Sequence, residues 1–207
     1  PETIIITSPK YKKVITEFNK NINIKIGPTL VFRDIFKKFR KKHNIKHLVI
    51  FNEIKNKNVQ ILKWLDYICL NGVENFFYIK IPKILNMSKE ISKFKQNKKF
   101  YFTDQNLPEL LKNSKYVITS GVGFSSTSLE AISYKCRLLI PVVDPLDSIY
   151  FQKLNISKKF YKLFLKKSDF LNYFQNRRKL REKDISEYEY NNFKSTYFSK
   201  GSEKIFF

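Results

Sequence analysis

Short apolar runs alternate with stretches of helical spacing along most of the chain from His47 onward. A short continuous apolar run is typical of a buried strand, whereas apolar residues recurring every third or fourth position are typical of a helix with one buried face. Strands are expected at 48–51, 76–81, 100–102, 116–118, 138–140 and 160–165. Because these runs are apolar throughout rather than alternating, they predict an α/β fold with an open parallel sheet covered by helices on both faces.

Helices are expected between these strands, at 58–70, 86–95, 107–111, 129–135 and 170–174. Asn106 and Ser168 precede two of them, and both residue types commonly accept hydrogen bonds from the first amides of a helix. In the helix 58–70, Ile61, Leu62 and Leu65 share one face, which is expected to pack on the sheet.

The two ends of the chain have a different character. Apolar β-branched residues at 3–7 and alternation at 22–26 predict two strands, with a helix over 11–18 between them. Residues 33–43 have the spacing of a strongly basic amphipathic helix, which is either a solvated surface helix or a contact for a membrane or another polyanion. Beyond Gln175 a basic and aromatic tail is expected to form helical pieces.

Composition limits the class of protein. Apolar residues make up 43% of the 207, which is enough for a packed core. Lys and Arg total 40 against 18 acidic residues, so the net charge of +22 favours nucleic acid, anionic lipid or phosphorylated substrates as partners, unless it partly reflects an AT-rich coding sequence. No run of apolar residues reaches the length of a membrane span.

Cysteine and histidine usage excludes two further classes. Cys69 and Cys136 are far apart in apolar surroundings, which is typical of a reduced, cytoplasmic protein rather than a disulfide framework. His43 and His47 are the only histidines, too few for a zinc cluster.

Residues 115–141 are the stretch most suggestive of chemistry. An apolar strand is followed by Gly121 and Gly123, then by hydroxyl residues at 125–128, a helix and a second strand. Glycines let a backbone approach a ligand closely, and hydroxyls with free amides at a helix N-terminus favour phosphate. Alternatively, the glycines only make a tight turn and the hydroxyls only cap the helix.

Glu130 lies one to two turns into this helix, where a carboxylate could accept two hydrogen bonds from a ribose diol. The dinucleotide fingerprint G-x-G-x-x-G is incomplete, because Ser126 stands in place of the third glycine, although Asp144 follows the next strand. No P-loop and no G-x-S-x-G nucleophile elbow is present. The late position of this unit in the chain, Ser126 in place of a third glycine, and Glu130 in the helix favour a sugar nucleotide over a redox dinucleotide.

The segment 114–141 resembles the donor-binding signature of GT-B-type glycosyltransferases. That signature is a strand, a turn of small residues, a Ser/Thr-led helix containing Leu-Glu-Ala, and a strand ending in Pro. The chain is more narrowly similar to bacterial surface-polysaccharide transferases. Residues 25–32 would be the crossing between their two domains, and 77–82 would match their Ile-Lys-Pro-His-Pro segment, with Ile81-Pro82-Lys83 standing where the histidine is usual.

The resemblance implies a Rossmann-like C-terminal domain of a two-domain fold. Residues 1–32 would be a remnant of the N-terminal domain and the linker, 33–174 the nucleotide-sugar-binding domain, and 175–207 the tail. On this comparison, the chain is a fragment or a degenerate relative of a full transferase.

The resemblance also implies a function. The turn would hold the diphosphate or phosphate of a nucleotide-sugar, Glu130 the ribose, and Lys80 would neutralise phosphate charge, without a metal or cofactor. The acceptor would be a cell-surface glycan or its lipid-linked precursor, met at the anionic inner face of a membrane. The residues expected to line the site are Thr119, Ser120, Gly121, Gly123, Ser125, Ser126, Thr127, Glu130 and Lys80.

A catalytic base is not identified, because nothing distinguishes Asp104, Asp144 and Asp147, all near strand ends. Two other functions stay open. One is a non-enzymatic module that binds polyanions through 33–43 and 177–183, although no recognisable nucleic-acid motif is present. The other is a nicotinamide-dependent Rossmann oxidoreductase.

Overall fold

The computed structural model describes residues 3–6, 16, 23–26, 39–120, 126–144, 156–176 and 185–198. The chain divides into two compact units. One unit combines 1–39 with 185–207, and the other is the continuous stretch 40–184. The larger unit contains a six-stranded sheet and the candidate site.

The larger unit is built on a six-stranded sheet whose paired strands are all parallel, as the sequence predicted. Its strand order is β5-β4-β3-β6-β7-β8. Within this sheet, the first strand in the sequence is the central strand β3, and the next two strands lie outward of it, as far as the edge strand β5. The chain then returns to the centre, where β6 begins the other half of the sheet. The strands are β3 (Ile45–Ile50), β4 (Phe77–Lys80), β5 (Phe100–Thr103), β6 (Ser114–Ile118), β7 (Arg137–Pro141) and β8 (Tyr161–Phe164).

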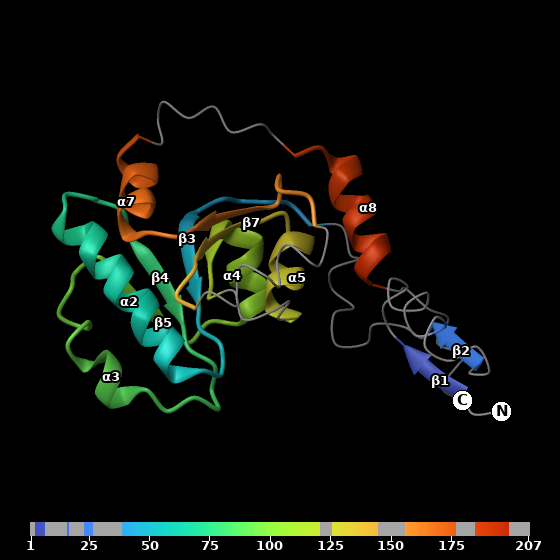
Figure 1. Ribbon diagram of the computed structural model, residues 1–207, viewed down its shortest axis with the longest axis horizontal. Helices are drawn as coiled ribbons and strands as arrows, with labels where there is room; N and C mark the ends of the chain where they lie inside the picture. Colours follow the sequence, from blue (N-terminus) through green and yellow to red (C-terminus); the bar gives the residue numbers. More distant parts are fainter. Residues whose placement is uncertain are drawn as a thin grey trace. The chain divides into compact units, whose positions relative to one another are not determined.

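Helices cover both faces of this sheet (Figure 1). The main apolar cluster joins one face to α2 (Lys55–Leu70), α3 (Ser88–Ser92) and α7 (Lys167–Asn176). The crossovers from β5 to β6 and from β6 to β7 run the opposite way along the sheet, so α4 (Leu107–Asn113) and α5 (Ser126–Ser133) lie on the other face. Buried side chains on that face come from both helices.

The predicted elements of this unit are confirmed, with small differences at their ends. Asn106 is the N-cap residue of α4, but its side chain makes no capping hydrogen bond. Ser168 is not a cap, because α7 already begins at Lys167. The basic helix predicted over 33–43 is wrong where it can be compared: 39–44 contain no helix, and 33–38 lie outside the described residues.

In this non-helical segment the Lys41 side chain is held by the larger unit instead of lying on a solvated helix face. Its ammonium donates to the carbonyl oxygens of Leu111 and Tyr134, both at 2.6 Å, and lies 3.1 Å from Cys136 Sγ. These acceptors follow or end two helices, where the backbone dipole favours a cation. Burial lowers the pKa of Lys41 and raises that of the Cys136 thiol. A side chain expected on a solvated face is thus an internal anchor.

The smaller unit contains two parallel strands, β1 (Thr3–Ile6) and β2 (Asn23–Ile26). It also contains α8 (Glu187–Tyr197), within the predicted tail. A capping box starts α8, because the Ser186 hydroxyl accepts from the Glu189 amide and the Glu189 carboxylate accepts from the Ser186 amide. The helix predicted over 11–18 lies outside the described residues except for Thr16.

Both cysteines are buried and unpaired as disulfides. None of the helices in the described ranges combines the length and the apolar character that crossing a bilayer requires.

Candidate functional site at the carboxyl edge of the sheet

The strand order reverses between β3 and β6, which are direct neighbours in the sheet. In open parallel sheets the crevice outside the carboxyl ends of the strands, at such a reversal, is where ligands bind. Polar residues follow the strands at this edge: Asn52 after β3, Thr119 and Ser120 after β6, and Asp144 after β7. Lys80 is the last residue of β4.

Asn52 and Ser120 join the two halves of the sheet at the reversal. The Asn52 side-chain amide donates to the Ser120 hydroxyl, which is almost completely buried. The Asn52 amide oxygen accepts from the Ile54 backbone N–H at 2.7 Å, which fixes the orientation of the Asn52 side chain. A direct contact therefore holds the turn after β6 against the turn after β3.

Asn58, in the first turn of α2, holds the backbone of Asn52 in place. Its side-chain oxygen accepts from Asn52 N–H at 3.1 Å, and its Nδ2 donates to the Asn52 carbonyl at 2.7 Å. Asn58 is completely buried, so these bonds replace its lost contacts with water. The position of the Asn52 side chain on Ser120 thus depends on Asn58.

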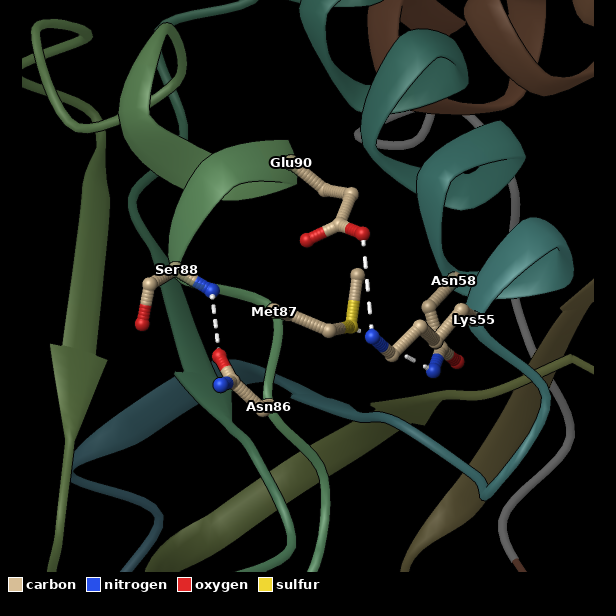
Figure 2. A network of polar contacts seen from close by, with 6 residues as sticks. All are labelled: Lys55, Asn58, Asn86, Met87, Ser88 and Glu90. Atoms are coloured by element: carbon tan, nitrogen blue, oxygen red, sulfur yellow. Dashed lines mark hydrogen bonds and ion pairs between the residues drawn. The ribbon is translucent and has the colours of Figure 1, made fainter.

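Two further contacts connect the first turn of α2 to α3 (Figure 2). Asn58 Nδ2 lies 3.7 Å from the sulfur of buried Met87. Lys55 forms an ion pair with Glu90 at 3.8 Å, and these two side chains are more exposed than Asn58 and Met87. The start of α2 is therefore held from both the sheet and the segment that follows β4.

Lys57 and Asp144 form an ion pair at 3.1 Å, with only 15% of the Lys57 side chain exposed. Lys57 belongs to the first turn of α2, after β3, whereas Asp144 follows β7, and β6 lies between these strands. The pair therefore spans the end of β6 and places an ammonium beside the reversal. The α2 N-terminus has no acidic residue in its first turn and no side-chain cap, which leaves amides directed to this edge.

The predicted phosphate turn is described only in part. Thr119 and Ser120 are buried next to the reversal. Ser126 is the first residue of α5, followed by half-buried Thr127 and buried Ser128. This arrangement directs the N-terminus of α5 to the carboxyl edge. Gly121, Gly123 and Ser125 lie outside the described residues.

Glu130 is the most unusual ionisable group of the site. It is 9% exposed, and its carboxyl group makes no hydrogen bond or ion pair with any residue that the structure describes. Desolvation by burial raises its pKa from 4.5 to about 7. A buried carboxyl group without a partner, one turn from the start of a helix at the strand reversal, is well suited to accept hydrogen bonds from a ligand.

Lys80 and the turn after β6 lie at the same edge but not in contact along the sheet. β3 separates β4 from β6, so the two strand ends are about 10 Å apart. Ile79 and Ile118 belong to the cluster under α2, so alternation directs Lys80 and Thr119 to the other face, which α4 and α5 cover. A ligand extending from α5 across the end of β3 would reach both.

Sequence reasoning missed three residues of this site: Asn52, Lys57 and Asn58. Asn58 had a detectable signal, since it is a polar residue on the apolar stripe of Ile61 and Leu62. Of the three aspartates considered as bases, Asp144 is tied to Lys57, Asp104 lies exposed near the β5 edge, and Asp147 is outside the described residues. Among the described residues, no group of His, Cys, Asp and Glu could hold a metal ion.

The fold has counterparts among solved structures. A glycosyltransferase from Rickettsia africae ESF-5 superposes with a TM-score of 0.55 at 12% identity, covering 96% of this chain and 60% of that chain. The C-terminal domain of a group 1 family glycosyl transferase (LpcC) from Francisella tularensis gives a TM-score of 0.45 at 8% identity, covering 82% of this chain and 88% of that one. The first likeness shows that the two chains share a fold. No family model and no curated protein matches the sequence.

Proposed function

We propose that this chain is the donor-binding part of a glycosyltransferase, which transfers a sugar from a nucleotide-activated donor to a cell-surface glycan or its lipid-linked precursor. Three observations support the proposal: the shared glycosyltransferase fold, the polar residues gathered at the strand reversal, and the isolated carboxyl group of Glu130. Glu130 is the observation that carries it, because a largely buried glutamate to which no described residue donates a hydrogen bond has a cost that a bound diol would offset.

In this proposal the ribose hydroxyls donate to Glu130 and the phosphate lies at the N-terminus of α5. Amides and hydroxyls of that turn would surround the phosphate oxygens, and the α5 dipole favours their negative charge. Lys57 in the first turn of α2 and Lys80 at the end of β4 supply positive charge. Lys57 would then be shared between Asp144 and the phosphate.

The proposed chemistry is displacement at the anomeric carbon of the donor sugar. An acceptor hydroxyl forms the new bond, while the bond from that carbon to the phosphate oxygen breaks and its electron pair stays on the nucleotide. Helix amides and lysine side chains stabilise this leaving charge, so a metal ion is not required for the step. The described residues do not single out the base that takes the acceptor proton.

Calorimetric titration of the full chain with CMP, UDP and GDP tests the donor site. One nucleotide should bind saturably, and Glu130→Ala should weaken it at least tenfold, about the value of one hydrogen bond to a charged group. Glu109→Ala is the matched control, because Glu109 lies on α4 and is exposed. The proposal fails if no nucleotide binds, or if the two variants bind equally well.

The alternative of a nicotinamide-dependent oxidoreductase has less support. The dinucleotide fingerprint belongs to the first strand-helix turn of such a sheet. Here that turn is 51–54, Phe-Asn-Glu-Ile, without a glycine, and the glycine pair follows β6 instead. A fluorescence titration with NADH should therefore show no saturable change.

A further inference from the structure

The edge of the sheet at which the strands begin, here called the amino edge, is strongly basic. The segments leading into the strands are 40–46, 71–77, 95–100, 112–115, 135–137 and 156–161. Within these segments Glu74 is the one acidic residue. Exposed lysines come from four of them: Lys42, Lys46, Lys95, Lys98, Lys115, Lys158 and Lys159. Parallel pairing alone gathers these residues, because parallel strands all begin on the same side.

The opposite, carboxyl edge is less basic. In the segments that follow the strands, Glu53, Asp104 and Asp144 offset part of the charge of Lys55, Lys83, Lys166 and Lys167. At the amino edge Glu74 alone opposes the lysines, so the excess positive charge of these segments is larger there than beside the candidate donor site. A general surplus of lysine would have made the two edges equally basic.

Two large apolar side chains are exposed within the same edge. Leu70 ends α2 with 80% of its surface exposed, and Phe76 precedes β4 with 63% exposed. Both belong to the connection from α2 to β4, which Lys46 and Lys98 flank at the starts of the neighbouring strands. Cations beside exposed apolar groups are the combination that anionic lipid surfaces attract.

We propose that the amino edge is a docking surface for an anionic lipid bilayer. Its lysines are attracted to the headgroup charge, and Leu70 and Phe76 enter the interface. Nucleic acid would also attract the lysines, but it offers no apolar medium for these two side chains. The proposal rests on the charge distribution and exposure at this edge, so it stands independently of the donor site. Docking in this way would leave the carboxyl edge uncovered.

Flotation of the full chain with vesicles of phosphatidylcholine, with and without phosphatidylglycerol, tests the electrostatic part. The variant Lys98→Glu/Lys115→Glu/Lys158→Glu should partition to the anionic vesicles at least about a hundredfold more weakly. The matched control Lys63→Glu/Lys83→Glu/Lys166→Glu has the same net charge, and its exposed positions lie away from the amino edge. It should keep most of the binding.

A second pair of variants tests whether the exposed apolar side chains contribute to membrane binding. Leu70→Ser/Phe76→Ser should weaken binding to anionic vesicles about tenfold, the value of burying one such side chain. Ile84→Ser/Leu165→Ser removes two similarly exposed apolar groups, 79% and 66%, from the carboxyl edge and should have no effect. Circular dichroism should be unchanged for all variants, because every substituted residue is exposed.

Three results would overturn the proposal. Equal loss of binding in both triple variants would show that only net charge matters. Equal behaviour of both apolar pairs would remove the role of Leu70 and Phe76. Duplex DNA that displaces the protein from vesicles, and that binds Leu70→Ser/Phe76→Ser as tightly as the unmodified chain, would identify the edge as a nucleic-acid surface instead.

Discussion

Glu130 is a largely buried glutamate to whose carboxyl group no described residue donates a hydrogen bond, and this shapes the chemistry at the residue scale. With a pKa of about 7, it is neutral in the folded protein at mildly acidic pH and charged in alkali. A ribose diol would stabilise the charged form by donating two hydrogen bonds. Burial of Glu130 therefore destabilises the folded protein when no ligand is bound, but it leaves the carboxyl group able to accept hydrogen bonds from a ligand.

This environment predicts a pH dependence of stability. Between pH 4.5 and about 7 the folded state binds more protons at Glu130 than the unfolded state does, so the free energy of unfolding falls as pH rises. The loss is complete above the folded pKa and amounts to at most about 3 kcal/mol. Glu130→Gln should remove this loss of stability at high pH. Compared with the unmodified chain, the variant should therefore be more stable at pH 8 than at pH 5.

Urea unfolding of both proteins at the two pH values, followed by the fluorescence of Trp64, measures this difference. Trp64 is the only tryptophan and is buried beside Phe170, so it reports on the larger unit. Glu109→Gln, at an exposed position, serves as the comparison. A stability difference that stays constant with pH would contradict the assigned pKa.

At the scale of elements, the first turn of α2 organises the strand reversal. Asn58 pairs with both backbone groups of Asn52, and Asn52 in turn contacts Ser120 on the other half of the sheet. One buried amide side chain thus links a helix to two strand ends. The link is polar within an otherwise apolar interface, so its loss leaves buried groups unpaired.

Asn58→Leu should therefore lower the free energy of unfolding by about 2–4 kcal/mol, since two backbone groups lose their partner. Asn56→Leu is the control, because Asn56 is exposed in the same turn. Urea unfolding followed by Trp64 fluorescence gives both values. If both variants lowered the free energy of unfolding by a similar small amount, Asn58 would not be holding the turn at Asn52.

The basic net charge of +22 acts at the scale of the whole molecule. Repulsion among like charges destabilises a compact state, and salt screens it. Raising the salt concentration from about 0.01 M to about 0.15 M shortens the screening length from roughly 30 Å to roughly 8 Å. The melting temperature should therefore rise over this range, measured by differential scanning fluorimetry.

Sodium chloride and potassium chloride should act equally if screening is the cause. A melting temperature that falls with either salt would show that attractive ion pairs, such as Lys57 with Asp144, outweigh the repulsion.

The sequence by itself determined the parallel sheet, its helices and the place of the turn after β6, because apolarity and spacing are local properties of the chain. It did not determine that β3 and β6 are neighbours, that Asn58 holds Asn52 against Ser120, or that Lys57 meets Asp144. These contacts join residues far apart in sequence and depend on how the crossovers order the strands. The same ordering gathered most of the lysines that flank the strands at the amino edge and placed Lys41 as an anchor between two helices, which no local pattern could show.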